Sequence, residues 1–290
     1  MSRTQRPLLP TITLGALLAL SLQTASAADP TERLFEAATQ GTPEEATAAL
    51  EAGADVNARD DNGVTPLMFA LADNEPAMAE FLIDQGADVE GRDDFGWTVL
   101  MDAAKHQTPA MAETLIELGA DVNAQDDFAS TALMVAAGNN EPAMIETLIE
   151  HGAEVDARDE EGWTALMVAA AQHEPAVATI LIDHGADIEV RNVHGWTSLV
   201  QAALRDDPAM VETLVEHGAD INTRDKNGST PLMDAAAHNI PSMVEALLAL
   251  GADPGLTNKE GQTAYDFLDD NFHISESDEV YQQLRAAGAD

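Results

Sequence analysis

The sequence has no cysteine among its 290 residues, and its basic residues are few. Without cysteine the chain can form no disulfide scaffold, no thiolate metal site and no cysteine nucleophile. Only 13 Lys and Arg stand against 52 Asp and Glu, so the formal net charge is −39. A chain this acidic repels a phosphate backbone, and we expect it to bind no nucleic acid. An anionic membrane surface is disfavoured for the same reason.

Aromatic residues are also scarce, at 4% of the chain. Any core must therefore consist mainly of Ala, Leu, Ile, Val and Met, and the 45% hydrophobic content argues against disorder over the whole length. The sequence contains no G-x-S-x-G, G-x-x-x-x-G-K-[ST] or H-E-x-x-H motif. We therefore expect no catalytic activity and no cofactor.

The first 27 residues are typical of a secretory signal peptide. Arg3 and Arg6 give a basic start, residues 12–22 form a short apolar stretch, and Ala25-Ser26-Ala27 has the A-x-A pattern of a cleavage site. The sequence therefore predicts cleavage after Ala27 and export to the periplasm or the extracellular space, with no membrane association afterwards. Loss of the two arginines changes the net charge of the mature chain from −39 to −41.

The rest of the chain repeats every 33 residues. The spacing holds for a glycine column at Gly53, Gly86, Gly119, Gly152, Gly185, Gly218 and Gly251. It also holds for a threonine column, from Thr65 to Thr263, and for a proline column, from Pro43 to Pro241. Three independent columns at one spacing indicate a solenoid of stacked units.

One unit contains Asp60-Asp-Asn-Gly63-Val-Thr65-Pro-Leu-Met-Phe-Ala70, then an apolar helical segment, and the next begins Gly86-Ala-Asp-Val. This pattern resembles the ankyrin repeat, D-x-x-G-x-T-P-L-H-x-A followed by G-A-D-V-N. The resemblance covers about residues 30–290 and implies an all-α ankyrin solenoid, in which each unit has a β-turn finger and two antiparallel helices. The predicted domain, 28–290, divides into an N-terminal cap 29–52, full repeats 53–85, 86–118, 119–151, 152–184, 185–217 and 218–250, and a C-terminal cap 251–290.

Several columns have clear structural roles. Threonine suits the N-cap of the first helix, and proline suits the first turn of the second. Glycine closes each finger turn, except at Ala129, where we expect a strained or locally rearranged finger. In the C-terminal cap we expect a first helix near Thr263 and a second at about 277–287, displaced by a polar insertion.

Ten methionines lie on two columns, one per helix of the unit. They are Met68, Met101, Met134, Met167 and Met233 on the first, where the family usually has His, and Met78, Met111, Met144, Met210 and Met243 on the second. We interpret both columns as core filling by a flexible side chain. The alternative is a copper(I) site or an oxidant-scavenging role, since thioethers are soft ligands.

The charged columns favour surface roles. Acidic finger tips such as Asp60-Asp61 offer an alternative function in Ca²⁺ binding, although no spaced calcium-loop motif is present. We expect Arg59, Arg92, Arg158, Arg191 and Arg224 to offset the Asp that follows each of them (Asn192 in the unit of Arg191), or else to meet an acidic partner. His151, His184 and His217 precede lattice glycines at helix ends and are too far apart to share a metal. The acid-rich, lysine-poor composition is halophile-like.

The candidate partner-binding residues are aromatic. All three tryptophans, Trp97, Trp163 and Trp196, occupy one finger column, and Phe95 and Phe128 lie two positions before that column in their own fingers. In ankyrin arrays this column lies on the concave side, where partners usually dock, and exposed aromatics are enriched in binding hot spots. The alternative is that each Trp packs on the next finger and only stiffens the array.

We therefore predict a monomeric, non-catalytic protein-interaction scaffold of the periplasm or extracellular space. Its partner would be another exported protein, and the negative field favours one with a basic surface. Two alternatives stay open: an ion-binding or oxidative-stress role, and a secreted effector that acts on a host cell.

Overall fold

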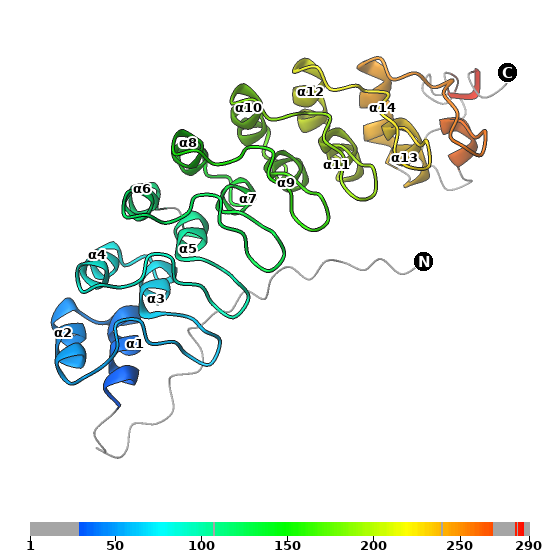
Figure 1. The fold of residues 1–290 in the computed structure, drawn as a ribbon. Helices are drawn as coiled ribbons and strands as arrows, with labels where there is room; N and C mark the ends of the chain where they lie inside the picture. The colour runs from blue at the N-terminus through cyan, green and yellow to red at the C-terminus, as the bar shows by residue number, and fades with distance from the viewer. Residues whose placement is uncertain (1–28, 107, 239, 269–281, 283, 287–290) are drawn as a thin grey trace.

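A computed structural model describes residues 29–106, 108–238, 240–268, 282 and 284–286. Over these residues the chain forms a curved array of helix pairs, in which the fingers and the odd-numbered helices line the concave side (Figure 1). The even-numbered helices form the outer layer. The structure confirms the predicted all-α solenoid.

Each unit contributes one helix to each layer. The first helices are α1 (Pro30–Gln40), α3 (Pro66–Ala72), α5 (Val99–Lys105), α7 (Ala132–Gly138), α9 (Ala165–Gln172), α11 (Ser198–Leu204) and α13 (Pro231–Ala237). The second helices are α2 (Pro43–Glu51), α4 (Pro76–Asp84), α6 (Pro109–Glu117), α8 (Pro142–Glu150), α10 (Pro175–Asp183), α12 (Pro208–Glu216) and α14 (Pro241–Ala249). A 3-10 turn, η2 (Ala264–Phe267), follows the last pair.

The repeated residues begin and end these helices as the sequence predicts. The Oγ1 atoms of Thr65, Thr98, Thr131, Thr164 and Thr230 accept the N–H three residues later. Proline occupies the first turn of every second helix, where its missing N–H leaves no bond unmade. The lattice glycines after these helices have φ between 92° and 107°, a region that costs other residues energy.

The finger at Ala129 keeps the same turn as its neighbours. Ala129 has φ 61°, whereas Gly96 and Gly162 have φ 75° and 77° at the equivalent position. The Ala129 N–H also donates to the Asp126 carbonyl at 2.9 Å, as the glycine does in the other fingers. Of the two expectations for this finger the structure supports strain, because the left-handed region costs a residue with a Cβ about 1–2 kcal/mol.

The core is continuous along the array. Leucines and alanines of successive helices pack between the two layers, and all ten methionines of the two columns are at most 5% exposed. This confirms the core-packing interpretation of the methionines. Buried thioethers in a dry apolar layer are poorly placed to meet a soluble oxidant or a metal ion.

The two ends differ from the middle. At the N-terminus α1 and α2 form a pair without a finger, and Phe35 meets Phe69 of the next unit edge-on at 5.3 Å. At the C-terminus the first element is the turn η2 rather than an α-helix, capped by Thr263 and Asp266. The predicted signal peptide, and most of the predicted last helix, lie outside the described residues. Within the described part of the chain no helix is long and apolar enough to span a bilayer.

Candidate partner-binding face

The finger tips are tied to one another by backbone hydrogen bonds. The Asp127 N–H donates to the Phe95 carbonyl at 2.9 Å, and the Glu160 N–H donates to the Phe128 carbonyl at 3.0 Å. The same bond links Asp94 to Asn62, Val193 to Glu161 and Lys259 to Asn227. These bonds join the first five tips into one rigid row and the last two tips to each other, which fixes the spacing of the side chains that they present.

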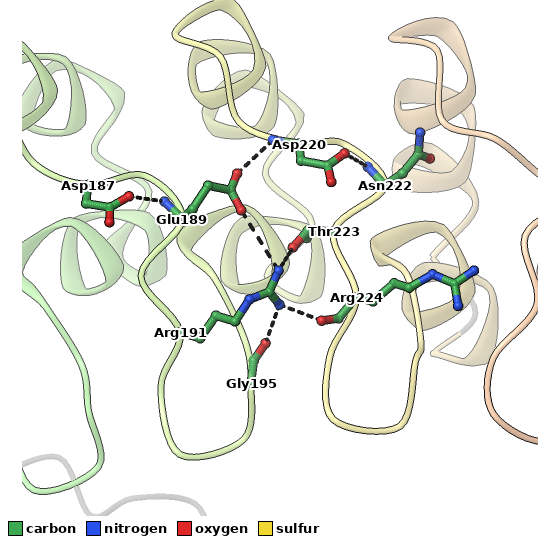
Figure 2. A network of polar contacts seen from close by, with 8 residues as sticks. All are labelled: Asp187, Glu189, Arg191, Gly195, Asp220, Asn222, Thr223 and Arg224. Atoms are coloured by element: carbon green, nitrogen blue, oxygen red, sulfur yellow. Dashed lines mark hydrogen bonds and ion pairs between the residues drawn. The ribbon is translucent and has the colours of Figure 1, made fainter.

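The arginine column adds side-chain hydrogen bonds between successive fingers. Arg191 donates to the carbonyls of Gly195 and Arg224 and, at 2.7 Å, to the Thr223 hydroxyl (Figure 2). Its guanidinium also lies 4.0 Å from Glu189. Arg92, Arg158 and Arg224 likewise donate to the carbonyl 33 residues ahead, and Arg59 pairs with Asp94 of the next finger at 2.7 Å.

These contacts correct the sequence interpretation of the arginines. Each guanidinium spans to the following finger instead of pairing with the Asp, or Asn192, that comes after it in the chain. Because an arginine so engaged holds two fingers together, the column is a poor site for an acidic partner. The family lattice alone does not reveal this, since it places fingers side by side without fixing side-chain directions.

The first acidic residue of each predicted acidic finger tip is likewise engaged in the fold. One carboxylate oxygen of Asp60, Asp93, Asp126 and Asp225 accepts the N–H groups two and four residues later. Such Asx turns fix the finger and leave these oxygens less able to bind a cation. Among the described residues no group of three or more His, Asp or Glu could hold a metal ion. The structure therefore gives the Ca²⁺ alternative no support.

The histidines at the outer-helix ends are held locally. The Nδ1 atoms of His151, His184 and His217 lie 2.7–2.8 Å from the carbonyl four residues earlier. His173 differs, because its Nδ1 lies 3.1 Å from Asp207 of the next unit. These positions fit the predicted role of histidine at helix C-termini.

The five candidate aromatics fall into two groups. Phe95 and Phe128 are 59% and 48% exposed, and neither packs on the core. The three tryptophans are partly buried. Trp97 packs against the core, and the Trp196 ring lies 5.1 Å from His194 in a tilted contact. The structure places all five on the fingers, with the phenylalanines protruding and the tryptophans lying in the surface.

Trp97 belongs to a small polar cluster with α5. Its Nε1 donates to the Asp102 carboxylate at 2.9 Å, and Lys105 Nζ lies 5.7 Å from the ring centroid, within cation–π range. Asp102 is 8% exposed. Burial raises the pKa of Asp102 from its usual 3.8 to about 7, and the Trp97 hydrogen bond and the Lys105 charge only partly oppose that rise.

Sequence reasoning missed a second polar cluster. Among the described residues four buried side-chain polar atoms have no hydrogen-bond partner: Asn192 Nδ2, Thr197 Oγ1, Gln201 Nε2 and Asp234 Oδ2. All four lie in the finger of repeat 185–217, in α11 or in the adjacent α13. Burial also raises the pKa of Asp234 to about 7, and Asp225 adds to the rise. One column of the first helix could have indicated these buried polar groups. It holds apolar residues at Phe69, Val135 and Val168 but polar residues at Asp102, Gln201 and Asp234.

Comparison with known proteins agrees with this geometry. Two family models for ankyrin repeats match, one at residues 34–126 and 119–192 and the other at 181–232 and 214–268. The chain belongs to the ankyrin repeat family. Ankyrin repeats bind protein partners and are typically non-catalytic.

Among solved structures this ankyrin repeat chain is similar to the ankyrin repeat domain of Bcl-3, a member of the IkappaB protein family. The TM-score is 0.66 and the identity is 25%, and the match covers 78% of this chain and all of that domain. No curated protein matches the chain.

Proposed function

We propose that this ankyrin repeat protein is a non-catalytic scaffold that binds another exported protein on its concave finger face. The observation that carries the proposal is the exposure of Phe95 and Phe128 on neighbouring fingers. Exposed phenylalanine on a rigid surface costs little entropy to bury against a partner, and rigid aromatic anchors dominate many interfaces. Trp97, Trp163 and Trp196 extend the same face along the array.

The location and the partner's charge rest on the sequence. Residues 1–27 have the three parts of a signal peptide, which supports the periplasm or the extracellular space. The mature chain would then carry a formal charge of −41, because Arg3 and Arg6 are removed. Such a field speeds association with a basic partner and disfavours an acidic one, and it opposes self-association, so we propose a monomer. An effector that acts on a host cell would use the same face outside the producing cell.

Affinity capture with matched variants tests the proposal. The bait is the wild-type chain, the combined Trp97→Ala, Trp163→Ala and Trp196→Ala variant, or the Phe95→Ser/Phe128→Ser variant, and the prey is an extract of exported proteins. Leu118→Ser is the matched control, because Leu118 is 53% exposed but follows the outer helix α6. We expect one set of exported proteins to bind wild type and Leu118→Ser and to be lost with the aromatic variants. Equal recovery with every bait would show that this face is not the binding site.

A further inference from the structure

The exposed tips of the seven fingers change character along the array. The exposed tip pairs, in order, are Asp61-Asn62, Asp94-Phe95, Asp127-Phe128, Glu160-Glu161, Val193-His194, Lys226-Asn227 and Lys259-Glu260. The chain has only three lysines, and two of them occupy the last two tips. The first four tips are acidic, so negative charge is concentrated at the N-terminal end of the row of fingers and the lysines lie at the other end.

Phe95 and Phe128 have no structural role that explains their exposure. Neither packs on the core, whereas Phe35 and Phe69 meet each other across a repeat boundary. Their fingers are joined by the hydrogen bond from the Asp127 N–H to the Phe95 carbonyl, so the two rings lie on adjacent, directly bonded fingers. A monomeric protein seldom keeps adjacent large apolar side chains on its surface without a use for them.

Acidic groups surround these two rings. Asp127, Glu160 and Glu161 are exposed and take part in no ion pair between described residues, while Asp94 is shared with Arg59. Arg92 and Arg158 donate to backbone carbonyls of the next finger rather than to these carboxylates. A cation that arrives at these tips therefore meets carboxylates that are not already held in an ion pair with a described basic side chain.

We propose that the fingertip site formed by Asp94-Phe95, Asp127-Phe128 and Glu160-Glu161 binds a short extended segment of the partner, in which basic and apolar side chains alternate at every second residue and so share one face. This inference rests on the proposed function and names the chemistry of its ligand. Packed repeats lie about 8–10 Å apart, so three fingers span about 16–20 Å. An extended chain rises about 3.3 Å per residue, so the site takes about five or six residues. Apolar side chains cover the rings and ammonium groups meet the carboxylates.

A defined peptide is the probe. A fluorescent heptapeptide with Leu, Lys, Leu and Lys at positions 1, 3, 5 and 7 and Ser between them, the Lys-Leu peptide, is titrated into the full chain at 0.15 M salt, and its anisotropy gives Kd. Two matched peptides replace either every Lys with Glu or every Leu with Ser. We expect the Lys-Leu peptide to bind at least about tenfold more tightly than either relative, because both the charge and the apolar contact are needed. Equal binding by the Lys-Ser peptide would overturn the proposal, since charge alone would explain it.

Matched variants separate a local site from the general negative field. Phe95→Ser/Phe128→Ser keeps every charge and should weaken the Lys-Leu peptide about tenfold or more, whereas Leu118→Ser should change Kd by less than about twofold. Asp127→Asn/Glu160→Gln should weaken it about threefold to tenfold. Glu113→Gln/Glu146→Gln likewise removes two charges, but from the exposed outer helices of repeats 86–118 and 119–151, and should have less than about a twofold effect. Equal losses in a test variant and its control would overturn the site.

The lack of cysteine allows a positional readout. A quencher on the peptide is combined with a dye on a single introduced cysteine, Asn62→Cys or Asn227→Cys, at equivalent tips near opposite ends of the row. We expect stronger quenching from position 62, and stronger quenching from 227 would contradict the proposal. If captured proteins are lost with the tryptophan variant while every fingertip variant binds the peptide normally, the fingertip site is wrong and the proposed function stands.

Discussion

Replacing Asp102 with Asn should stabilise the array at neutral pH and leave it unchanged in acid. Asp102 is 8% exposed between the Trp97 indole and the rest of α5, and its pKa is about 7 because burial penalises the charged form. In the unfolded chain the same carboxyl titrates near 3.8. Asn has nearly the same shape and keeps an oxygen that can accept the Trp97 Nε1–H, so the substitution removes mainly the ionisation.

The sign follows from proton uptake. Between about pH 4 and pH 7 the folded state holds a proton on Asp102 that the unfolded state has lost, so wild-type stability falls as the pH rises through this window. The interval from 3.8 to about 7 corresponds to about 4 kcal/mol, at about 1.4 kcal/mol for each pKa unit. The stability gain of Asp102→Asn should therefore be near zero at pH 4 and approach about 4 kcal/mol, as an upper bound, at pH 8.

Urea unfolding at pH 4, 5, 6, 7 and 8 measures this difference, because urea leaves electrostatic interactions unscreened, whereas guanidinium chloride does not. Hydrogen exchange of the α5 amides gives the same quantity locally, which matters in an array whose repeats need not unfold together. Glu113→Gln is the control, since it removes one exposed charge from the same repeat. A difference between Asp102→Asn and wild type that stays flat from pH 4 to pH 8 would refute the reasoning.

Three further predictions concern stability. Ala129→Gly should stabilise the protein by about 0.5–1 kcal/mol, because relief of the left-handed alanine outweighs the backbone entropy of glycine; a loss of stability in urea would show that Ala129 is unstrained. Raising NaCl from 0.05 M to 1 M should increase Tm, because salt screens the repulsion within the exposed glutamate column of Glu80, Glu113, Glu146, Glu212 and Glu245. That repulsion is about 0.4 kcal/mol per neighbouring pair at ~10 Å in water, and at 1 M salt the Debye length shrinks to about 3 Å. An unchanged Tm would count against the halophile-like interpretation. Methionine sulfoxide formed by peroxide should lower Tm, because all ten column methionines are at most 5% exposed, and extensive oxidation without such a shift would contradict their core role.

The lattice was predictable from sequence because it follows from local chemistry. A threonine three residues before a backbone N–H, a proline in a first turn and a glycine after a helix each act within one turn of the chain, and each occurs where the columns place it. The ends were less predictable. The region after Thr263 forms a 3-10 turn, and a repeat pattern carries little information where no further unit stacks upon it.

The candidate face was predictable only in outline. The aromatic columns placed five residues on the fingers, but spacing alone could not show that Phe95 protrudes while Trp97 bonds to Asp102. The arginine contacts depend on which way a long side chain extends, and the repeat pattern leaves that open. The high pKa of Asp102 depends on burial between repeats, which one sequence column does not reveal.

The cross-finger contacts of the arginines all run in one direction. Arg92, Arg158, Arg191 and Arg224 each reach the carbonyl 33 residues ahead, and the side chains of Asn123 and Asn222 accept the N–H 31 residues ahead. These units therefore present an arginine donor and a side-chain acceptor to the unit ahead; repeat 119–151 has Gln125 at the arginine position. Removing 33 residues in register, such as 119–151, would place the Arg158 carbonyl where the Gln125 carbonyl now accepts from Arg92, and so leave compatible groups at the junction. The number of units, and with it the length of the row of fingers, can therefore change by duplication or loss of whole repeats while the contacts between neighbouring fingers are kept.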